Sequence, residues 1–191
     1  MKLPFALIFL LLSFHNLAQK EVPKIYQWSE VKWANPDTIY AVSFEKMKLD
    51  SLPKELWKFT HLTYLNLEKN QLAQLPEELV LLEQLTELNI SKNKFTFLPL
   101  IICQLPNLQK LNASRNRIAS IPNQIENCTH LQKIDFYDNI IEDFGTGIFQ
   151  LKELKTLNIE GVMYGTNFAD ELKRKLPNTH LLLDPPCKCL N

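Results

Sequence analysis

The sequence predicts an α/β solenoid, in which short repeats stack and each adds one strand to a β-sheet. Apolar residues recur every 23 residues from Ile39 to Leu154, without insertion. The first part of each unit has apolar residues alternating with polar ones, which is typical of a half-buried strand. A constant period of this length indicates repeats that become stable only when they stack on their neighbours.

Six units can be aligned, and together they occupy residues 39–161. Four of them have an asparagine after the strand, whereas the first and last have Met47 and Val162 at that position. The end units of a stack are commonly atypical. Four units also have a proline before the segment that returns over the convex side, and the fifth has Gly145 there. The asparagines are Asn70, Asn93, Asn116 and Asn139, and the prolines are Pro53, Pro76, Pro99 and Pro122.

The asparagines are expected to form a ladder, because each side-chain amide can bond backbone groups where the chain leaves its strand. The prolines fix the backbone and begin the convex segment. The full pattern, LxxLxLxxNxLxxLPxxLxxLxx, resembles that of the leucine-rich repeat family over residues 39–161. This resemblance implies a horseshoe with its parallel sheet on the concave face, and a role in protein–protein interaction or surface adhesion.

Residues 19–38 and 162–191 are expected to cap the two ends of the stack. In the first cap a short helix is predicted from Ser29 to Ala34, with Ser29 as its N-cap. The second cap is predicted to contain a helix at Asn167–Lys175 and a last strand at His180–Leu183. Small helical caps of this kind resemble those of secreted bacterial leucine-rich repeat proteins.

Residues 1–18 are expected to be a secretory signal peptide that is cleaved after Ala18. Lys2 supplies the positive charge, Phe5–Leu12 the apolar run, and Ala18 the small residue at the cut. The run is too short to span a bilayer, which takes about 20 residues. The mature protein is therefore expected to be secreted or periplasmic, without stable insertion in a membrane.

The concave face offers the candidate partner-binding residues. The position inside each strand that faces the hollow is occupied mainly by amides, and a basic row follows just after the strands. The basic row would suit an acidic partner, and two tyrosines could anchor contacts. An alternative is that these positions are simply solvated polar residues of the repeat. The candidates are Lys46, Lys69, Lys92, Arg115, Tyr64, Tyr137, Asn66, Asn89, Asn112 and Asp135.

Several functional classes find no support in the sequence. The chain has 21 basic and 21 acidic side chains, which argues against the one-sided basic surface of a nucleic-acid binder. Its four glycines all lie between positions 145 and 165, so the first three quarters of the chain cannot hold a glycine-rich phosphate loop. No catalytic or metal-binding motif is present. We therefore expect no enzyme activity, no cofactor and no metal.

The four cysteines allow several disulfide pairings. Cys128 occupies a leucine position of the repeat and is expected to be buried. A bond to Cys103 is not expected, because one strand spacing plus two residues places the Cα atoms about 7–8 Å apart. Whether Cys187 and Cys189 pair remains open.

The sequence therefore predicts a non-catalytic, secreted recognition module whose concave face binds a protein, peptide or glycan. The alternative is an intracellular scaffold of signalling proteins, which the repeat type also resembles and which would apply if the N-terminal signal is not used. The identity of the partner and the oligomeric state stay open.

Overall fold

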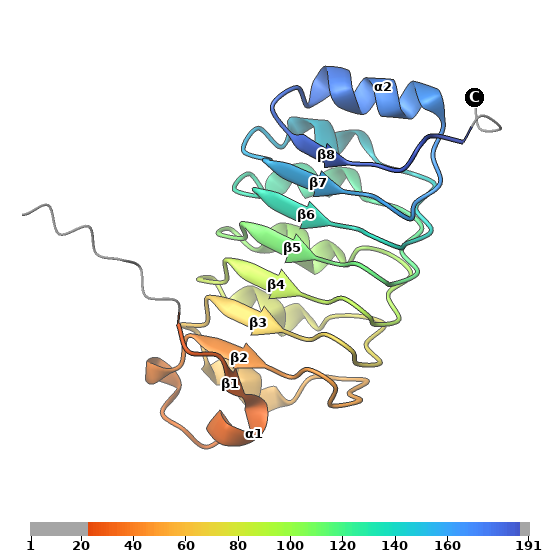
Figure 1. Ribbon diagram of the computed structural model, residues 1–191. Helices are drawn as coiled ribbons and strands as arrows, with labels where there is room; N and C mark the ends of the chain where they lie inside the picture. Colours follow the sequence, from red (N-terminus) through yellow and green to blue (C-terminus); the bar gives the residue numbers. More distant parts are fainter. Residues whose placement is uncertain (1–22, 188–191) are drawn as a thin grey trace, which may run out of the picture.

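A computed structural model describes residues 23–187 and contains one sheet of eight parallel strands in the order β1 to β8. Figure 1 shows the strands stacked along the molecule in sequence order, from the N-terminal end to helix α2 at the other end. Six strands, β2 to β7, follow the 23-residue period and confirm the predicted solenoid. The strands are β1 Tyr26–Gln27, β2 Ala41–Ser43, β3 Tyr64–Asn66, β4 Glu87–Asn89, β5 Lys110–Asn112, β6 Lys133–Asp135, β7 Thr156–Asn158 and β8 His180–Leu182.

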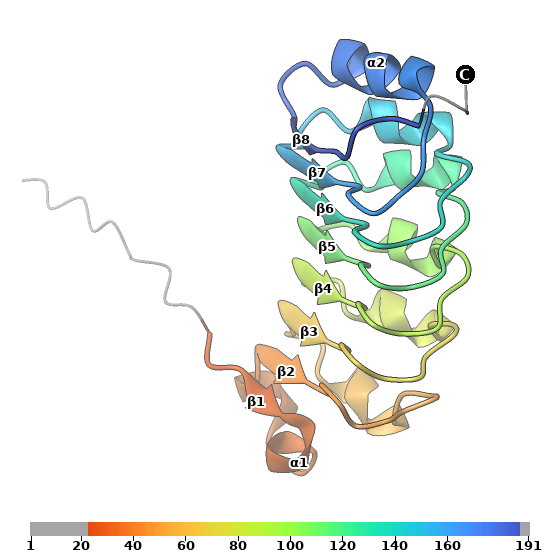
Figure 2. The same cartoon turned by 45° about the vertical axis from the view of Figure 1, so that its right-hand side comes forward.

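Helices α1 and α2 lie at the two ends of the stack, and most of the helical segments between them lie on the side opposite the strands, as Figure 2 shows. Five of them are single 3₁₀ turns on the convex side, and each of the first four begins directly after a repeat proline. In each of those four, the proline has an extended backbone and is the N-cap residue. The helical elements are α1 Trp28–Val31, η1 Pro36–Thr38, η2 Lys54–Lys58, η3 Glu77–Leu81, η4 Leu100–Gln104, η5 Asn123–Asn127, η6 Thr146–Gln150 and α2 Thr166–Lys175.

The strand register places equivalent residues of successive repeats directly beside one another. Leu65 pairs with Leu88, and Leu88 pairs with Leu111. These central residues point into the core and are at most 2% exposed. Every column of residues that recurs at the 23-residue period is therefore a column in space, with neighbours about 4.8 Å apart. This relation decides which side chains can act together.

The fifth repeat departs from the others at two glycines. Gly145 replaces the repeat proline and has a φ of +27°, which side-chain-bearing residues rarely adopt. Two residues later, a Cβ atom on Gly147 would lie 1.9 Å from the carbonyl oxygen of Asn123. The two glycines therefore let η6 approach η5 more closely than a side chain would allow.

The N-terminal cap differs from the prediction in two respects. Strand β1 was not expected, and it pairs in parallel with β2. The helix runs from Trp28 to Val31 rather than from Ser29 to Ala34, so the prediction of Ser29 as N-cap is wrong. Gln27 holds that position in a capping box, because Glu30 accepts a hydrogen bond from the Gln27 N–H. Trp28 then stacks on Phe44 at a centroid distance of 4.9 Å and closes the core.

The C-terminal cap contains the predicted helix and strand, with α2 starting one residue before the expected position. Phe168 of α2 stacks on Phe144 at a centroid distance of 4.3 Å. The hydroxyl of Tyr164 donates to the carbonyl of Asp184, which joins the turn before α2 to the last segment. No helix within residues 23–187 is long and apolar enough to cross a membrane.

Cys103 and Cys128 are buried and unpaired, as expected. The hydrogen bond with Cys103, together with burial, raises the pKa of the Cys128 thiol, which leaves it protonated and unreactive. Cys187 is disulfide-bonded, whereas Cys189 lies outside the described residues. The predicted signal peptide, residues 1–18, also lies outside them.

Candidate functional site

The concave face presents one outward side chain from the start of each of the strands β3 to β6. Tyr64, Glu87, Lys110 and Lys133 stand side by side on β3 to β6 and border a shallow hollow of about 200 Å³. Lys110 Nζ lies 2.5 Å from Glu87 Oε1. Burial, and then the carboxylates of Glu87, Glu68 and Glu45, raise the pKa of Tyr64, so its phenol remains a hydrogen-bond donor at neutral pH. The hollow therefore combines both signs of charge with one aromatic ring.

The predicted amide column lies at the end of the strands and has a backbone partner in every repeat. In each case the side-chain Oδ1 accepts a hydrogen bond from the backbone N–H two residues later, at 2.9–3.1 Å. This is the local turn that Asn and Asp commonly form. The column therefore shapes the turns, and Asn66 is only 8% exposed. Its members are Asn66, Asn89, Asn112 and Asp135.

The predicted basic row occupies a left-handed backbone position in each repeat. The φ angles of its four residues lie between 53° and 61°. Asp138 and Gly161 continue the same column, with φ of 56° and 76°. This conformation is costly for residues with a Cβ atom and is usually filled by Gly, Asn or Asp. The four residues are Lys46, Lys69, Lys92 and Arg115.

Carboxylates from the preceding column lie among these cations. Lys92 Nζ is 2.7 Å from Glu68 Oε1, and Lys69 Nζ is 3.4 Å from Glu45 Oε1. Lys46 pairs with Glu45 at 2.9 Å. The first three cations therefore form an alternating ladder with two carboxylates rather than a bare positive line.

The fourth cation, Arg115, has a different environment. Its guanidinium lies 5.4 Å from the ring centre of Tyr137, and its Nε is 3.9 Å from Asp138 Oδ2. Tyr137 follows β6, whereas Tyr64 lies on β3, so the two predicted tyrosines are three strands apart. The structure does not bring them together in one site.

The ion-pair ladder shifts the carboxylate pKa values downward. The hydrogen bond from Lys46 is the main cause of the lowered pKa of Glu45. Burial acts to raise the pKa of Glu68, but the hydrogen bond and charge of Lys92, with the charge of Lys69, outweigh it and lower the pKa. Both carboxylates are therefore ionised at neutral pH and reduce the net positive charge of the row.

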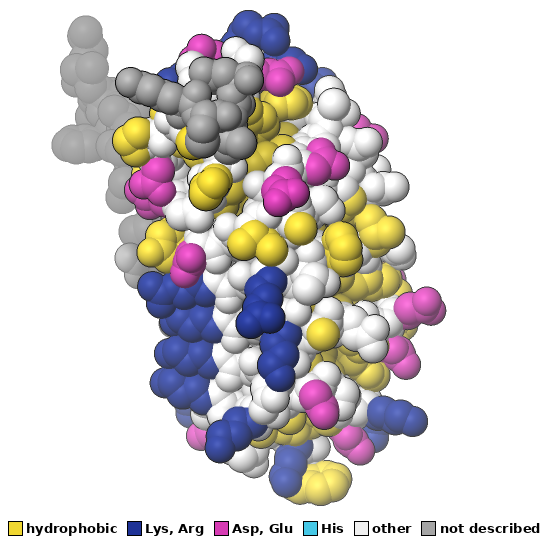
Figure 3. Space-filling view, turned by 90° about the vertical axis from the view of Figure 1, so that its right-hand side faces the viewer, with side chains coloured by type: hydrophobic (Ala, Val, Ile, Leu, Met, Phe, Trp, Pro, Cys, Tyr) yellow, Lys and Arg dark blue, Asp and Glu magenta, His cyan; other side chains and the backbone are white. Residues whose placement is uncertain are grey.

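A second basic row lies two residues further along each repeat and was missed in the sequence. Lys48, Lys94 and Arg117 occupy this column, with Gln71 between the first two. Lys94 Nζ bonds the neutral side chain of Gln71 at 2.9 Å. In Figure 3 the Lys and Arg side chains of this edge gather over the lower half of the molecule. Reading the 23-residue columns past the asparagine would have found this row.

The asparagine ladder ties each repeat to the one before it. Asn70 Nδ2 donates to the carbonyl of Phe44 at 2.8 Å and to that of Leu67 at 3.0 Å. Its Oδ1 accepts from the backbone N–H of Leu49 at 3.0 Å. The same arrangement recurs at Asn93, Asn116 and Asn139. These side chains are structural, because every polar atom of the amide contacts backbone. Within the part of the chain that the structure describes, His, Cys, Asp and Glu side chains do not gather in groups that could hold a metal ion.

Known proteins share both the repeat and the fold. The family model for the leucine-rich repeat region matches residues 41–183. A leucine-rich repeat protein of Leptospira interrogans is 31% identical over 75% of this chain, with a TM-score of 0.65. No curated protein sequence matches the chain.

Two further solved structures share the fold at lower identity. A plant peptide hormone receptor in complex with RGF2 is 22% identical over 76% of the chain, with a TM-score of 0.58. TLR13 in its complex with ssRNA13 is 21% identical over 84% of the chain, with a TM-score of 0.68. The chain spans only 35%, 24% and 23% of the Leptospira, plant receptor and TLR13 chains, respectively. The TLR13 structure contains RNA, so the expectation that this chain does not bind nucleic acid is not supported by the fold. The match over residues 41–183 shows that the chain belongs to the leucine-rich repeat family.

Proposed function

We propose that this protein is a non-catalytic, secreted recognition module that binds an acidic segment of a partner protein. The binding surface is the hollow of the concave face together with the two basic rows beside it. The observation that carries the proposal is the register, which places Lys110 and Lys133 side by side in the hollow. Repeat proteins commonly use such extended concave surfaces for binding.

The pattern of charges favours a protein over a uniformly charged polymer. Glu45 and Glu68 pair with cations of the first basic row, and Glu87 pairs with Lys110 in the hollow. A nucleic acid or an acidic polysaccharide would meet these carboxylates with like charge in each of the first three repeats. An acidic protein segment that also contains donors and cations can match both signs.

Secretion is part of the proposal and rests on the pattern of residues 1–18. The test is the intact mass of the native protein from each cell fraction. A periplasmic or secreted species that begins at Gln19 supports the proposal. A full-length species in the cytoplasm would favour the alternative, an intracellular scaffold for signalling proteins.

Partner binding is tested with matched charge reversals. The variant Lys110→Glu/Lys133→Glu alters the hollow, and Lys54→Glu/Lys58→Glu makes the same charge change at exposed positions of convex segment η2. Each protein is immobilised and exposed to extracellular proteins, and the affinity of any captured partner is then measured. We expect the concave variant to lose about tenfold or more in affinity and the convex variant to retain it. Equal loss in both variants, or none in either, would contradict binding through the concave face.

A further inference from the structure

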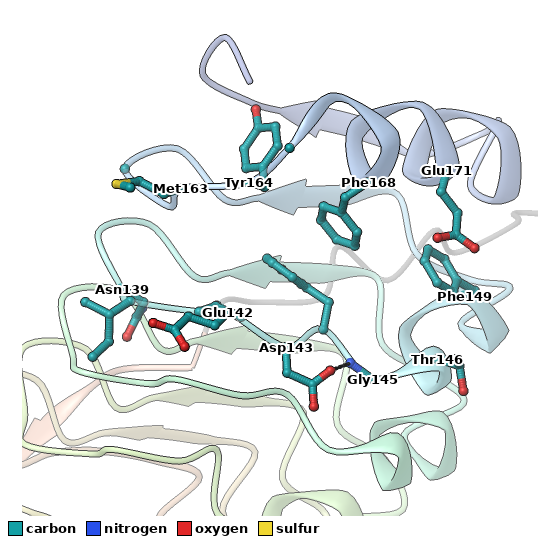
Figure 4. A pocket seen from close by; sticks show the side chains of 15 residues that line it. Asn139, Glu142, Asp143, Gly145, Thr146, Phe149, Met163, Tyr164, Phe168 and Glu171 are labelled. Atoms are coloured by element: carbon teal, nitrogen blue, oxygen red, sulfur yellow. Dashed lines mark hydrogen bonds between the residues drawn. The ribbon is translucent and has the colours of Figure 1, made fainter. Parts of the chain in front are cut away.

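A second and larger cavity, of about 870 Å³, lies beside the C-terminal cap and shares no lining residue with the hollow of the concave face. Its lining comes from the turn after β6, from η6, from the turn after β7 and from α2. In Figure 4, Tyr164 and Phe168 lie on the cap side of this cleft, and Glu142 and Asp143 lie on the side of the preceding repeat. We call it the cap cleft.

The glycines of the fifth repeat help to open the cap cleft. Gly147 lets η6 lie against Asn123 of η5, because a Cβ atom there would overlap the Asn123 backbone. The Asp143 carbonyl also accepts a hydrogen bond from the Ile121 N–H at 2.8 Å, which holds the same segment on the fourth repeat. The fifth repeat therefore packs tightly toward the fourth. On its other side α2 replaces the regular convex turn, and the cleft lies between them.

The floor of the cap cleft is aromatic. Phe144 and Phe168 stack across it at 4.3 Å, and Tyr164 meets Phe168 edge-on at 6.1 Å. Phe149 also lines the cleft, with Lys175 Nζ 4.4 Å from its ring centre. Aromatic surface of this kind favours a large apolar side chain.

The rim exposes apolar residues at positions that are basic in earlier repeats. Ile140 and Met163 continue the column of Lys94 and Arg117, and they are 61% and 71% exposed. Exposed apolar side chains beside an aromatic floor form a continuous patch of the kind that marks interaction sites. In Figure 3 hydrophobic and acidic side chains replace the basic ones over the upper half of this edge.

The charge of the cap cleft is negative. Glu142, Asp143 and Glu171 line it, and none of the described lining residues is Lys or Arg. Glu171 pairs with Lys175 at 2.7 Å, and one oxygen of Asp143 accepts from the Gly145 N–H at 3.1 Å. Glu142 is exposed, and no ion pair within residues 23–187 involves it. A ligand with a cation next to an apolar group would complement this arrangement.

We propose that the cap cleft binds a peptide segment of a partner that contains a large apolar side chain flanked by Lys or Arg. The apolar side chain contacts Phe144, Phe168 and Met163, and the cation pairs with Glu142. This surface adjoins the end of the second basic row at Ile140 and has the opposite charge. The protein would then hold a partner at two sites of different chemistry.

The test uses an array of synthetic decapeptides in which net charge and the number of apolar side chains vary independently. The labelled protein is applied as wild type and as two variants with the same charge change. Glu142→Lys alters the rim of the cleft, and Glu55→Lys alters an exposed position of η2. We expect wild type and Glu55→Lys to select peptides that are both basic and apolar, and Glu142→Lys to lose about tenfold or more of that signal.

A second measurement locates the binding on the molecule. Methyl NMR of the wild type with the strongest peptide of the array should shift the signals of Ile140 and Met163 while that of Leu81, an exposed convex residue, stays in place. Selection that follows charge alone, or an unchanged signal in Glu142→Lys, would overturn the proposal. An array without any signal would also overturn the proposal. In that case the mass of the protein in solution is measured, and a mass that rises with protein concentration would identify the patch as a self-association surface.

Discussion

The backbone N–H of Leu72 donates to Oδ1 of Asn93 at 3.0 Å, although the two residues are 21 positions apart. The same amide donates from Nδ2 to the carbonyl of Leu67 at 2.9 Å and to that of Ile90 at 3.0 Å. One side chain therefore satisfies backbone groups of two successive repeats. Because the groups are poorly accessible to water, removing the amide leaves them without partners.

Replacing Asn93 with Ala is expected to destabilise the protein by about 1–3 kcal/mol, the usual cost of leaving buried polar groups without partners. The free energy of unfolding can be measured with urea. The matched control is Asn107→Ala, because Asn107 is exposed and makes a single side-chain bond to the Glu83 carbonyl. Equal losses in the two variants would show that the ladder adds nothing beyond a surface hydrogen bond.

The repeat region could be predicted in detail because its signals are local and repeated. The alternation around Leu65 and Leu88 fixes each strand, and a period without insertion fixes the register between them. The register in turn fixes the columns, so the hollow bordered by Tyr64 and Lys110 follows from the sequence once the columns are aligned.

The caps and the pairing of charges could not be predicted in the same way. Strand β1 is two residues long and exists only through its pairing with β2. The Lys92–Glu68 pair joins residues 24 positions apart, and its geometry depends on a left-handed turn that Lys rarely occupies. The cap cleft joins segments of the fifth repeat to the turn after β7 and to α2, and the period does not predict where α2 lies.

Gly147→Ala is expected to destabilise the protein by about 1–3 kcal/mol or more, because the added methyl group would overlap the Asn123 carbonyl. The control is Gln124→Ala, which places the same residue at the equivalent, exposed position of η5. Thermal unfolding of both variants gives the comparison. If Gly147→Ala unfolds at the wild-type temperature, η6 does not lie against η5 as closely as described.

Acid is expected to weaken the ion-pair ladder through Glu68. Its pKa in the folded protein is below the ordinary value of 4.5 because the pairing with Lys92 and Lys69 outweighs the effect of burial. The stabilisation is therefore complete above that ordinary value and is lost as the pH falls through the lower, folded-state pKa. The free energy of unfolding should fall less in Glu68→Gln than in the wild type between about pH 5 and about pH 3. The control Glu78→Gln, on exposed convex segment η3, should keep the wild-type dependence, and a wild-type slope in Glu68→Gln would contradict the assignment.

Because the basic row has a left-handed backbone, the energetic cost of a side chain there can be measured separately from its contribution to binding. Arg115 has a φ of 53°, whereas Arg117, two residues later, is not among the residues with positive φ. At Arg115 the Gly variant should be more stable than the Ala variant by about 1 kcal/mol, since only glycine adopts this conformation freely. At Arg117 the Ala variant should instead be more stable than the Gly variant, by about 0.5–1 kcal/mol. Each pair of variants removes the same guanidinium, so the difference reports the backbone alone.

The same variants connect this strain to function. If Arg115→Gly is as stable as the wild type yet binds the partner about tenfold more weakly, the side chain is present for binding and not for the fold. Urea unfolding and the affinity for the captured partner are measured on the same preparations. The opposite pattern, lower stability with full affinity, would mean that the contacts of Arg115 with Tyr137 and Asp138 are structural. The basic row would then be part of the stack, and the hollow around Lys110 would remain as the binding surface.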